Sequence, residues 1–271
     1  MSDHEGHGRA DRMNADAAGD WKRWHEHREE TVSAPYGPLA LVGSHWIEDH
    51  PDGRLPAVPG SWAADGDGVV LTATAADGLA LDGEPFAGEV RLAADPEPSA
   101  RVTLGARRLV VLVREGVWGI REYDPAAGTR HAFRGIDATP YDPRWSVPGR
   151  FTPYDDDPRT VRVGTADGVE RALVLAGELG FAVAGQDLTL QVAEQADGRL
   201  WAVFADTTSG AGSFRFRFLY SAAPAADGST TVDFNRAQLP QCAFADHFIC
   251  PFPPPGNTLD LAVEAGERKL A

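Results

Sequence analysis

From residue 39 onward the chain consists of short apolar or alternating segments separated by turn residues. Glu115-Gly116 separates the segment Arg107–Arg114 from Val117–Tyr123, and Asp-Gly pairs follow at 167–168, 197–198 and 227–228. Glycine adopts positive φ without steric cost, so such pairs are typical of tight turns between antiparallel strands. We find no βαβ pattern and no second long helical pattern in this region. The sequence therefore predicts a mainly β fold built from antiparallel strands.

Further strands are expected wherever apolar residues form short runs or alternate with polar ones. These segments are 39–47, 68–75, 161–163, 169–175, 187–194, 199–205, 213–221 and 230–234. Alternation is typical of strands with one face on a core and one face in water. Two packed sheets and a closed barrel both satisfy the pattern, and closure removes unpaired strand edges. We expect an antiparallel barrel-like or two-sheet core with long irregular loops, notably at 124–160.

The N-terminal part of the chain differs from the rest. Residues 1–19 are polar, so a disordered tail is expected there. Trp21 and Trp24 then recur at helical spacing, which predicts a short helix over about 20–32 that lays its tryptophans on the body. The rest of the chain, 20–271, is expected to form a single β-rich domain that includes this helix.

The charge balance limits the partners that this chain can bind. Forty acidic residues against 25 basic ones give a formal net charge of −15. A field of that sign repels phosphate backbones and anionic lipid, so neither nucleic acid nor a membrane is an expected partner. We expect neither a membrane-spanning segment nor a secretory signal, because no apolar run of the required length occurs and the first residues are polar and acidic. We expect a cytoplasmic protein, and the sequence leaves its oligomeric state open.

Several uncommon strings occur in order along the C-terminal quarter. They are Asp-Phe-Asn-Arg-Ala at 233–237, Cys242, Cys-Pro-Phe-Pro-Pro-Pro-Gly-Asn at 250–257 and Ala-Gly-Glu at 265–267. Together with Trp24-x-x-x-Arg28 and Tyr36-Gly37-x-Leu39, they resemble the bacterial and archaeal family known as domain of unknown function 1684, over roughly residues 21–268. That family has no established activity, so the resemblance implies which residues are of interest and no reaction. The segment 214–219 is bulky where the family has a glycine-rich strand, which puts in doubt any close approach of a ligand at that strand.

The first group of candidate residues follows a predicted strand. Asp233 and Asn235 would share one face of that strand, with Arg236 beside them. One interpretation is a clamp for an anionic group, since an arginine forms charge-assisted hydrogen bonds to carboxylates. The other is a structural network in which Asp233 pins Arg236 and Asn235 caps the following loop. Both interpretations stay open at the level of sequence.

A second group has the spacing Cys-x4-His-x2-Cys, formed by Cys242, His247 and Cys250. A zinc site would need a fourth ligand, such as Asp246 or His45. A Cys–His pair could instead supply a nucleophile, and the two cysteines could form a disulfide or remain as buried reduced thiols.

A third pattern has three phenylalanines at 214, 216 and 218 that alternate with Arg215 and Arg217. The arginines would either be solvated over a phenylalanine core or point into an interior and attract an acidic ligand. Period two alone does not say which face points inward.

The leading functional hypothesis is that the protein binds a small anionic organic ligand in an interior or rim pocket. The candidate ligand-binding residues are Asp233, Asn235, Arg236, Trp46 and Asn257, with the loop 240–257. One alternative is a hydrolase or isomerase that uses Cys242 or His247 catalytically, or a metal such as zinc held by Cys242, His247 and Cys250. Another is a protein-interaction module that uses the tryptophan-bearing helix or the proline-rich segment 251–255.

Overall fold

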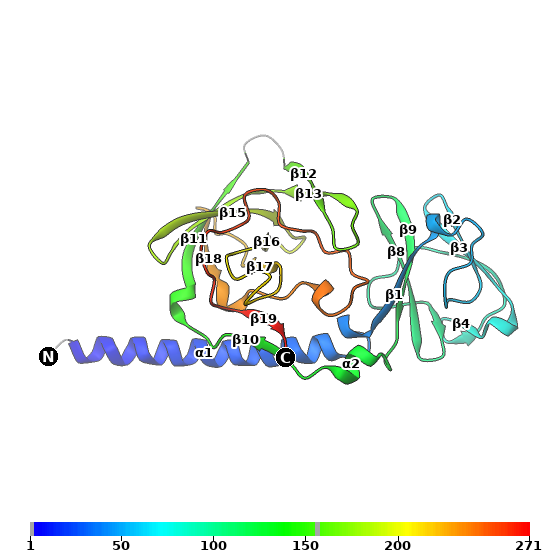
Figure 1. The fold of residues 1–271 in the computed structure, drawn as a ribbon, viewed down its shortest axis with the longest axis horizontal. Helices are drawn as coiled ribbons and strands as arrows, with labels where there is room; N and C mark the ends of the chain where they lie inside the picture. The colour runs from blue at the N-terminus through cyan, green and yellow to red at the C-terminus, as the bar shows by residue number, and fades with distance from the viewer. Residues whose placement is uncertain (1–2, 155–157) are drawn as a thin grey trace. The chain divides into compact units, whose positions relative to one another are not determined.

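The computed structural model describes residues 3–154 and 158–271, with side chains described from Asp16 onward. The chain forms two compact units, of which the first joins the part up to Glu29 with Arg134–Ala271 and the second is Glu30–Phe133. Each unit has its own cluster of buried apolar side chains. The predicted mainly β, antiparallel fold is confirmed (Figure 1). The expectation of a single domain over 20–271 stays a prediction, because packing into two units does not decide whether they unfold together.

Helix α1 (Asp3–Ser33) is the long helix of the structure, and it starts well before the expected residue 20. Several residues of the segment 3–19 are alanines, which have the highest helix propensity, and the disorder expected for 1–19 stays a prediction. Within the first unit, the half-buried residues of α1 fall at helical spacing: Trp21, Trp24, His25, Arg28 and Glu29. This stripe is the face that contacts the rest of the first unit, as the predicted tryptophan spacing indicated.

The first unit is organised around one antiparallel sheet with the strand order β17-β16-β15-β14-β11-β18. Its strands are β11 (Ser146–Pro153), β14 (Gly177–Val183), β15 (Gln186–Glu194), β16 (Leu200–Phe204), β17 (Arg217–Ser221) and β18 (Ser229–Asp233). The two edge strands, β17 and β18, follow one another in sequence, and Thr230 Oγ1 beside their turn donates to the carbonyl of Ala222 at 3.1 Å. The sheet therefore curls into a half-barrel (Figure 1).

The core of the first unit lies on the concave face of this sheet. Leu190 and Val192 of β15 are fully buried, as their predicted alternation required. Phe234 lies at the centre, where the rings of Phe181 and Phe204 meet it edge-on at centroid distances of 5.4 and 5.6 Å. Aromatic rings in this arrangement are favourable beyond the area that they bury.

Two short two-stranded antiparallel pairs complete the first unit. Strand β10 (Ile136–Ala138) pairs with β19 (Glu267–Leu270), and β12 (Arg159–Gly164) pairs with β13 (Glu170–Leu175). Three single-turn helices also matter below: η4 (Pro143–Trp145), η5 (Phe234–Arg236) and η6 (Gln241–Ala243).

The segment 124–160, expected to be irregular, contains β10, η4 and β11, which lies next to the edge strand β18. Pro148 and Pro153 argued against a strand there, since proline cannot donate to a neighbouring strand. Pro148 is paired with β18 alone, and Pro153 is the last residue of β11. Strand β18 pairs with the N-terminal half of β11, and β14 pairs mainly with its C-terminal half. Each proline therefore lies where the N–H group that it lacks is not needed.

The second unit contains a six-stranded sheet of order β1-β9-β8-β7-β4-β5 and a three-stranded sheet of order β2-β3-β6. The strands of the larger sheet are β1 (Leu41–Trp46), β4 (Leu79–Leu81), β5 (Glu84–Pro85), β7 (Val102–Leu104), β8 (Arg107–Arg114) and β9 (Val117–Tyr123). Those of the smaller are β2 (Ser61–Asp65), β3 (Gly68–Ala73) and β6 (Gly88–Leu92). Both sheets contribute to one core that includes Trp62, Leu71 and Leu109. The hairpin β8–β9 has the bounds predicted from Glu115-Gly116.

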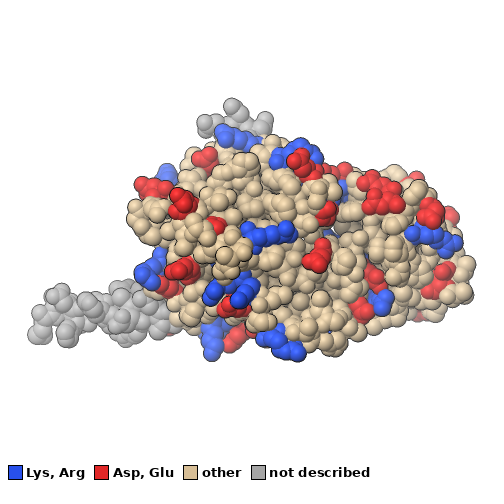
Figure 2. Space-filling model, viewed as in Figure 1, with Lys and Arg blue, Asp and Glu red and all other residues tan. Residues whose placement is uncertain are grey.

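Outside the sheets, the second unit has α2 (Gly128–Ala132) and the single-turn helices η1 (Pro38–Ala40), η2 (Ile47–Asp49) and η3 (Ala75–Asp77). Across the described part of the chain, no helix is both long and apolar enough to cross a membrane. On the face drawn in Figure 2, basic and acidic side chains lie interspersed rather than in separate patches.

Candidate functional site

The predicted trio at 233–236 lies at the end of β18 and in the following turn η5. Asp233 Oδ1 accepts hydrogen bonds from the backbone N–H of Asn235 at 3.1 Å and from its Nδ2 at 2.9 Å. Arg236 Nε lies 3.5 Å from Asp233 Oδ2, and its guanidinium lies over the ring of Trp24 at 5.6 Å. The three side chains are therefore brought together, and they contact one another as the structural-network interpretation described.

Asn235 connects this network to a neighbouring segment of chain. Its side chain is completely buried, its Oδ1 accepts from the N–H of Asp142 at 2.9 Å, and its Nδ2 donates to the Asp142 carbonyl at 3.0 Å. The carbonyl of Asn235 accepts a hydrogen bond from Nε1 of Trp21 at 2.7 Å. A single residue thus holds the segment around Asp142 and helix α1 against the end of β18.

Asn257 has a similar role between two strands of the sheet. Strands β15 and β16 pair only at their adjoining ends, Ala193–Glu194 with Leu200–Trp201. Beyond that point the buried Asn257 amide accepts from the N–H of Gln191 at 2.8 Å and donates to the carbonyls of Gln191 and Val203 at 2.8 and 2.9 Å. Because the amide donors of Asn235 and Asn257 are taken up by the protein, ligand contacts at this site must come from other groups.

Trp46 lies in the other unit. It is on β1, opposite Gly119 of β9, and a side chain at position 119 would collide with its ring. The site described below is therefore built only from residues of the first unit.

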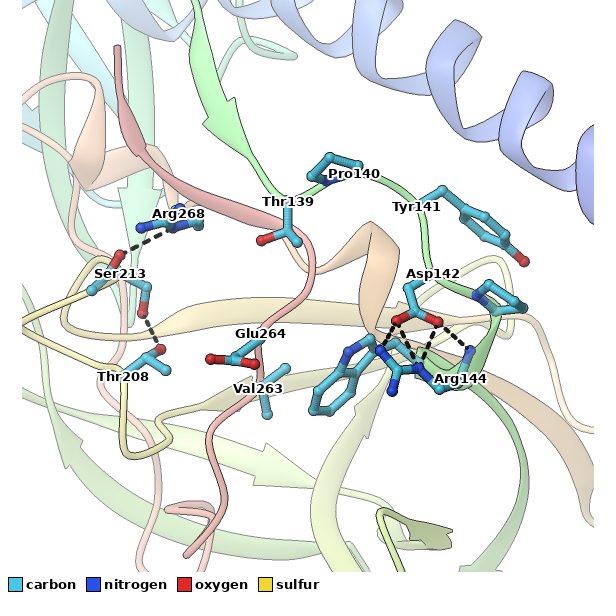
Figure 3. Close-up of a pocket in the computed structure, with 13 residues that line it drawn as sticks. Thr139, Pro140, Tyr141, Asp142, Arg144, Thr208, Ser213, Val263, Glu264 and Arg268 are labelled. Carbon is cyan, nitrogen blue, oxygen red and sulfur yellow. Dashed lines mark hydrogen bonds and ion pairs between the residues drawn. The ribbon is translucent and has the colours of Figure 1, made fainter.

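A pocket with a volume of about 660 Å³ opens in the first unit beside the Asn235 network. Three segments form its walls, 139–145, 208–213 and 263–268 (Figure 3). The first segment is the one that Asn235 holds through Asp142. Sequence reasoning did not single out these segments as a site. The one available signal was the string Asp206-Thr-Thr-Ser, whose side chains are suited to a tight polar turn.

The other two walls are held together by a buried ion pair. Arg217 of β17 and Asp206 are both inaccessible, with Arg217 Nη2 at 2.6 Å from Asp206 Oδ2. The same guanidinium donates to the carbonyls of Val263 at 3.0 Å and Ala265 at 2.5 Å. Asp206 Oδ1 in turn accepts from the N–H of Thr208 at 2.7 Å, which shapes the loop 206–213. Burial lowers the pKa of Arg217 while Asp206 opposes that shift, so the pair places one buried charge against another.

The Arg217–Asp206 ion pair shows which arginine of the alternating segment 214–218 points inward. Arg217 is inside, together with Phe216 and Phe218, whereas Arg215 is exposed. The segment therefore does not have one aromatic and one cationic face, and the inward arginine binds the protein's own carbonyls.

The pocket combines polar and aromatic groups. Arg268 donates through Nε to the carbonyl of Gly212 at 3.2 Å, and its Nη1 is 3.9 Å from Asp137 Oδ2. Beside it the hydroxyls of Thr208 and Ser213 are 2.8 Å apart. On the opposite side, as Figure 3 shows, Arg144 and Asp142 form a two-pronged ion pair. The lining also includes Tyr141, Trp145 and the carboxylate of Glu264.

Burial raises the pKa of Tyr141, and the nearby Asp233 adds to this shift. The phenol of Tyr141 therefore stays protonated at neutral pH and can donate a hydrogen bond.

The cysteines lie away from these walls. Cys242 is in η6, and its N–H donates to Sγ of Cys250 at 3.3 Å; both thiols are reduced and buried, while His247 is exposed. Among the residues that the structure describes, no three His, Cys, Asp or Glu side chains are grouped as metal ligands, so this arrangement gives the zinc hypothesis no support. Hydrolysis or isomerisation by Cys242 or His247 stays a prediction.

The proline-rich segment packs on its own unit. Pro251 forms a bridge with Thr165, and the ring of Phe252 meets that of Phe216 at 5.5 Å. The tryptophans of α1 are likewise engaged within the first unit, through Asn235 and Arg236. The interaction-module hypothesis stays a prediction.

Comparison with known proteins places the chain in a family. The family described as "Protein of unknown function (DUF1684)" matches residues 131–268, which include the pocket walls, the 233–237 string and both cysteines. One similar solved structure is the solution NMR structure of an uncharacterised protein from Haloarcula marismortui. It is 33% identical, covers 51% of this chain and 78% of that chain, and has a TM-score of 0.43. No curated protein matches the chain. The family match covers about half of the chain, and the chain therefore belongs to the DUF1684 family of proteins of unknown function.

Proposed function

We propose that this protein binds a small organic acid in the pocket formed by 139–145, 208–213 and 263–268. The observation that carries the proposal is the corner where the Arg268 guanidinium lies beside the hydroxyls of Thr208 and Ser213. The volume of about 660 Å³ falls within the range typical of small-molecule sites, roughly 300–1,000 Å³. The cytosolic location expected from the sequence is part of the same proposal.

The corner has the donors that a carboxylate needs. The 3.9 Å separation between Arg268 Nη1 and Asp137 is longer than a hydrogen bond, so Asp137 leaves donor capacity on this guanidinium. A carboxylate there would accept from Arg268 and from one hydroxyl. Charge-assisted hydrogen bonds of this kind contribute about 1.5–3 kcal/mol each.

The remaining charges indicate what the rest of the ligand carries. Asp142 is neutralised by Arg144, whereas Glu264 is exposed at the pocket (Figure 3). A second carboxylate on the ligand would be repelled by Glu264, while a hydroxyl or amino group would be a favourable partner. Tyr141 and Trp145 are the aromatic residues of the lining and offer surface for a ring or chain of the ligand. The ligand class that fits is a monocarboxylic acid that also carries a hydroxyl or amino group.

The first test is calorimetric titration of the whole protein with para-hydroxybenzoate and with its neutral match, para-hydroxybenzamide. The two probes have the same size and hydroxyl and differ in the carboxylate. We expect the acid to bind more tightly than the amide. Equal binding of both, or binding of neither, would contradict the proposed anion corner.

The matched variants are Arg268→Gln in the pocket and Arg150→Gln on the exposed surface of β11. Loss of one charge-assisted hydrogen bond corresponds to roughly tenfold weaker binding or more. Arg268→Gln is expected to weaken binding of para-hydroxybenzoate by that factor, while Arg150→Gln leaves it unchanged. The same loss in both variants would indicate nonspecific attraction to positive charge.

A further inference from the structure

Cys242 and Cys250 form a close pair outside the pocket. The N–H of Cys242 donates to Sγ of Cys250 at 3.3 Å, which places that sulfur directly beside the backbone of Cys242. The side chain of Cys250 is also the largest influence on the pKa of Cys242, which it lowers. The surrounding backbone is held in place, because the carbonyl of Cys250 accepts from Ala166 at 2.9 Å and Pro251 bridges to Thr165. The two sulfurs are therefore near neighbours on an ordered frame.

The two thiols have different surroundings. Arg215 faces Cys242, and its guanidinium lies over the ring of Phe252 at 4.8 Å and over that of Phe216 at 5.4 Å. The hydrogen bond from Cys250 lowers the pKa of Cys242 and Arg215 lowers it further, against the effect of burial. The Cys242 thiolate and burial together raise the pKa of Cys250. Cys242 is thus the thiol that ionises, and Cys250 is the one that keeps its proton.

Access to solvent is narrow but present. Cys242 retains 7% and Cys250 6% of its exposure, and the side chain that faces Cys242, Arg215, is itself exposed. A small oxidant would therefore approach Cys242 past the exposed Arg215 side chain rather than through the core.

We propose that Cys242 and Cys250 are an oxidant-sensitive dithiol, in which Cys242 reacts with a hydroperoxide and Cys250 then closes a disulfide. The Cys242 thiolate attacks one peroxide oxygen, the O–O bond breaks, and the leaving hydroxide takes a proton to become water, or an alcohol from an organic peroxide. The Cys250 sulfur then attacks the sulfenic acid of Cys242, and the S–O bond breaks as a second water leaves with the Cys250 proton. Two thiols lose two electrons and the peroxide gains them.

The disulfide would close the loop 242–250, which follows the backbone that contacts α1. Arg28 of α1 donates to the carbonyl of Leu239 at 2.9 Å, three residues before Cys242. None of these residues lines the pocket, so this proposal stands or falls independently of organic-acid binding.

The experiment treats the folded, reduced protein with a small excess of hydrogen peroxide. We expect loss of both free thiols, an intact mass lower by two hydrogen atoms, a cross-linked peptide joining Cys242 to Cys250, and full reversal by dithiothreitol. If both thiols persist, or if oxygen atoms are added to the sulfurs without a cross-link, the proposal is wrong.

Single variants test the order of the steps. Cys250→Ser is expected to accumulate a sulfenic acid that dimedone traps at Cys242, whereas Cys242→Ser reacts much more slowly. Arg215→Gln should slow the reaction severalfold, because loss of the guanidinium raises the pKa of Cys242 and so lowers its thiolate fraction. Arg150→Gln is the control and should match the wild type. Equal rates for the two cysteine variants, with native far-ultraviolet circular dichroism in both, would overturn the assignment of roles.

Discussion

At Arg217, one guanidinium supplies hydrogen bonds to acceptors from two separate segments. It binds Asp206, which precedes the pocket wall 208–213, and the carbonyls of Val263, Ala265 and Glu267 in the wall 263–268. A buried charge of this kind is tolerated only because its partners replace the water that it lost. The residue therefore acts on the pocket through the walls that it holds.

Arg217→Met would leave Asp206 and three carbonyls buried without this donor. Removal of one partner of a buried ion pair typically costs about 3–5 kcal/mol, so we expect a decrease of that size in the free energy of unfolding. Urea denaturation monitored by tryptophan fluorescence measures it. The exposed Arg150→Met variant should stay within about 0.5 kcal/mol of the wild type. A similar small effect from Arg217→Met would show that the carbonyls find other partners.

At the level of elements, helix α1 is attached to the first unit through Glu267 of β19. This carboxylate is completely buried, accepts from Arg28 Nε at 3.1 Å and from the N–H of Leu239 at 2.7 Å, and is preceded by Gly266, which has φ of 76°. A β-carbon at Gly266 would come within 2.7 Å of two carbonyl oxygens, those of Phe234 and Ala237. The Ala-Gly-Glu string therefore brings the chain close enough for Glu267 to reach the helix.

The buried carboxylate of Glu267 predicts that the free energy of unfolding depends on pH. Burial raises the pKa of Glu267 above its ordinary value of 4.5, with Arg28 opposing the shift. The folded state therefore binds the proton more tightly than the unfolded state does. The stability from this group is fully present below pH 4.5 and is lost as pH rises through the raised pKa.

Glu267→Gln mimics the protonated form, so wild type should lose stability relative to this variant as pH rises from below 4.5 toward neutrality. Urea midpoints of both proteins across this range measure the difference, and charge effects elsewhere cancel in the comparison. If the difference in urea midpoint between the two proteins stays constant with pH, or changes in the opposite direction, the raised pKa of Glu267 is contradicted.

At the scale of the whole molecule, two separate cores raise the question of cooperativity. The core of the second unit includes Leu71, and that of the first includes Phe204 and Phe234. Leu71→Ala should create a cavity that costs about 2–5 kcal/mol in its own unit. We expect hydrogen exchange, followed by mass spectrometry, to accelerate in peptides from 41–123 and to stay unchanged in those from 146–204. Equal acceleration in both regions would show one cooperative domain, as the sequence suggested.

Local patterns in the sequence predicted much of the β structure. Glycine after Glu115, Asp167, Asp197 and Asp227 has positive φ at each turn, because no β-carbon opposes that backbone geometry. Alternation in 187–194 correctly indicated the buried face of β15. Pro148 concealed β11, since whether a proline is tolerated depends on which neighbouring strand reaches it, and that is decided by tertiary pairing.

In the candidate site, too, the sequence indicated some features and only the tertiary structure showed the others. The uncommon strings at 233–237, 250–257 and 265–267 include Asn235, Asn257 and Glu267, whose side chains connect distant parts of the first unit. The sequence left open whether these side chains bind a ligand or the protein, because an asparagine amide serves either equally well until its neighbours are known. The amide of Asn235 binds the backbone of Asp142, and that of Asn257 binds the backbone of Gln191 and Val203.

The sequence by itself determined the strand-and-turn pattern, the acidic charge and the family, because these depend on residue type and short-range spacing. Only the tertiary structure decided that Arg217 is inside and Arg215 outside, and that Cys242 meets Cys250. It also decided that three segments far apart in the chain surround one pocket. Those outcomes depend on the register and curl of a sheet whose partners are distant along the chain, and period-two alternation is the same for either face.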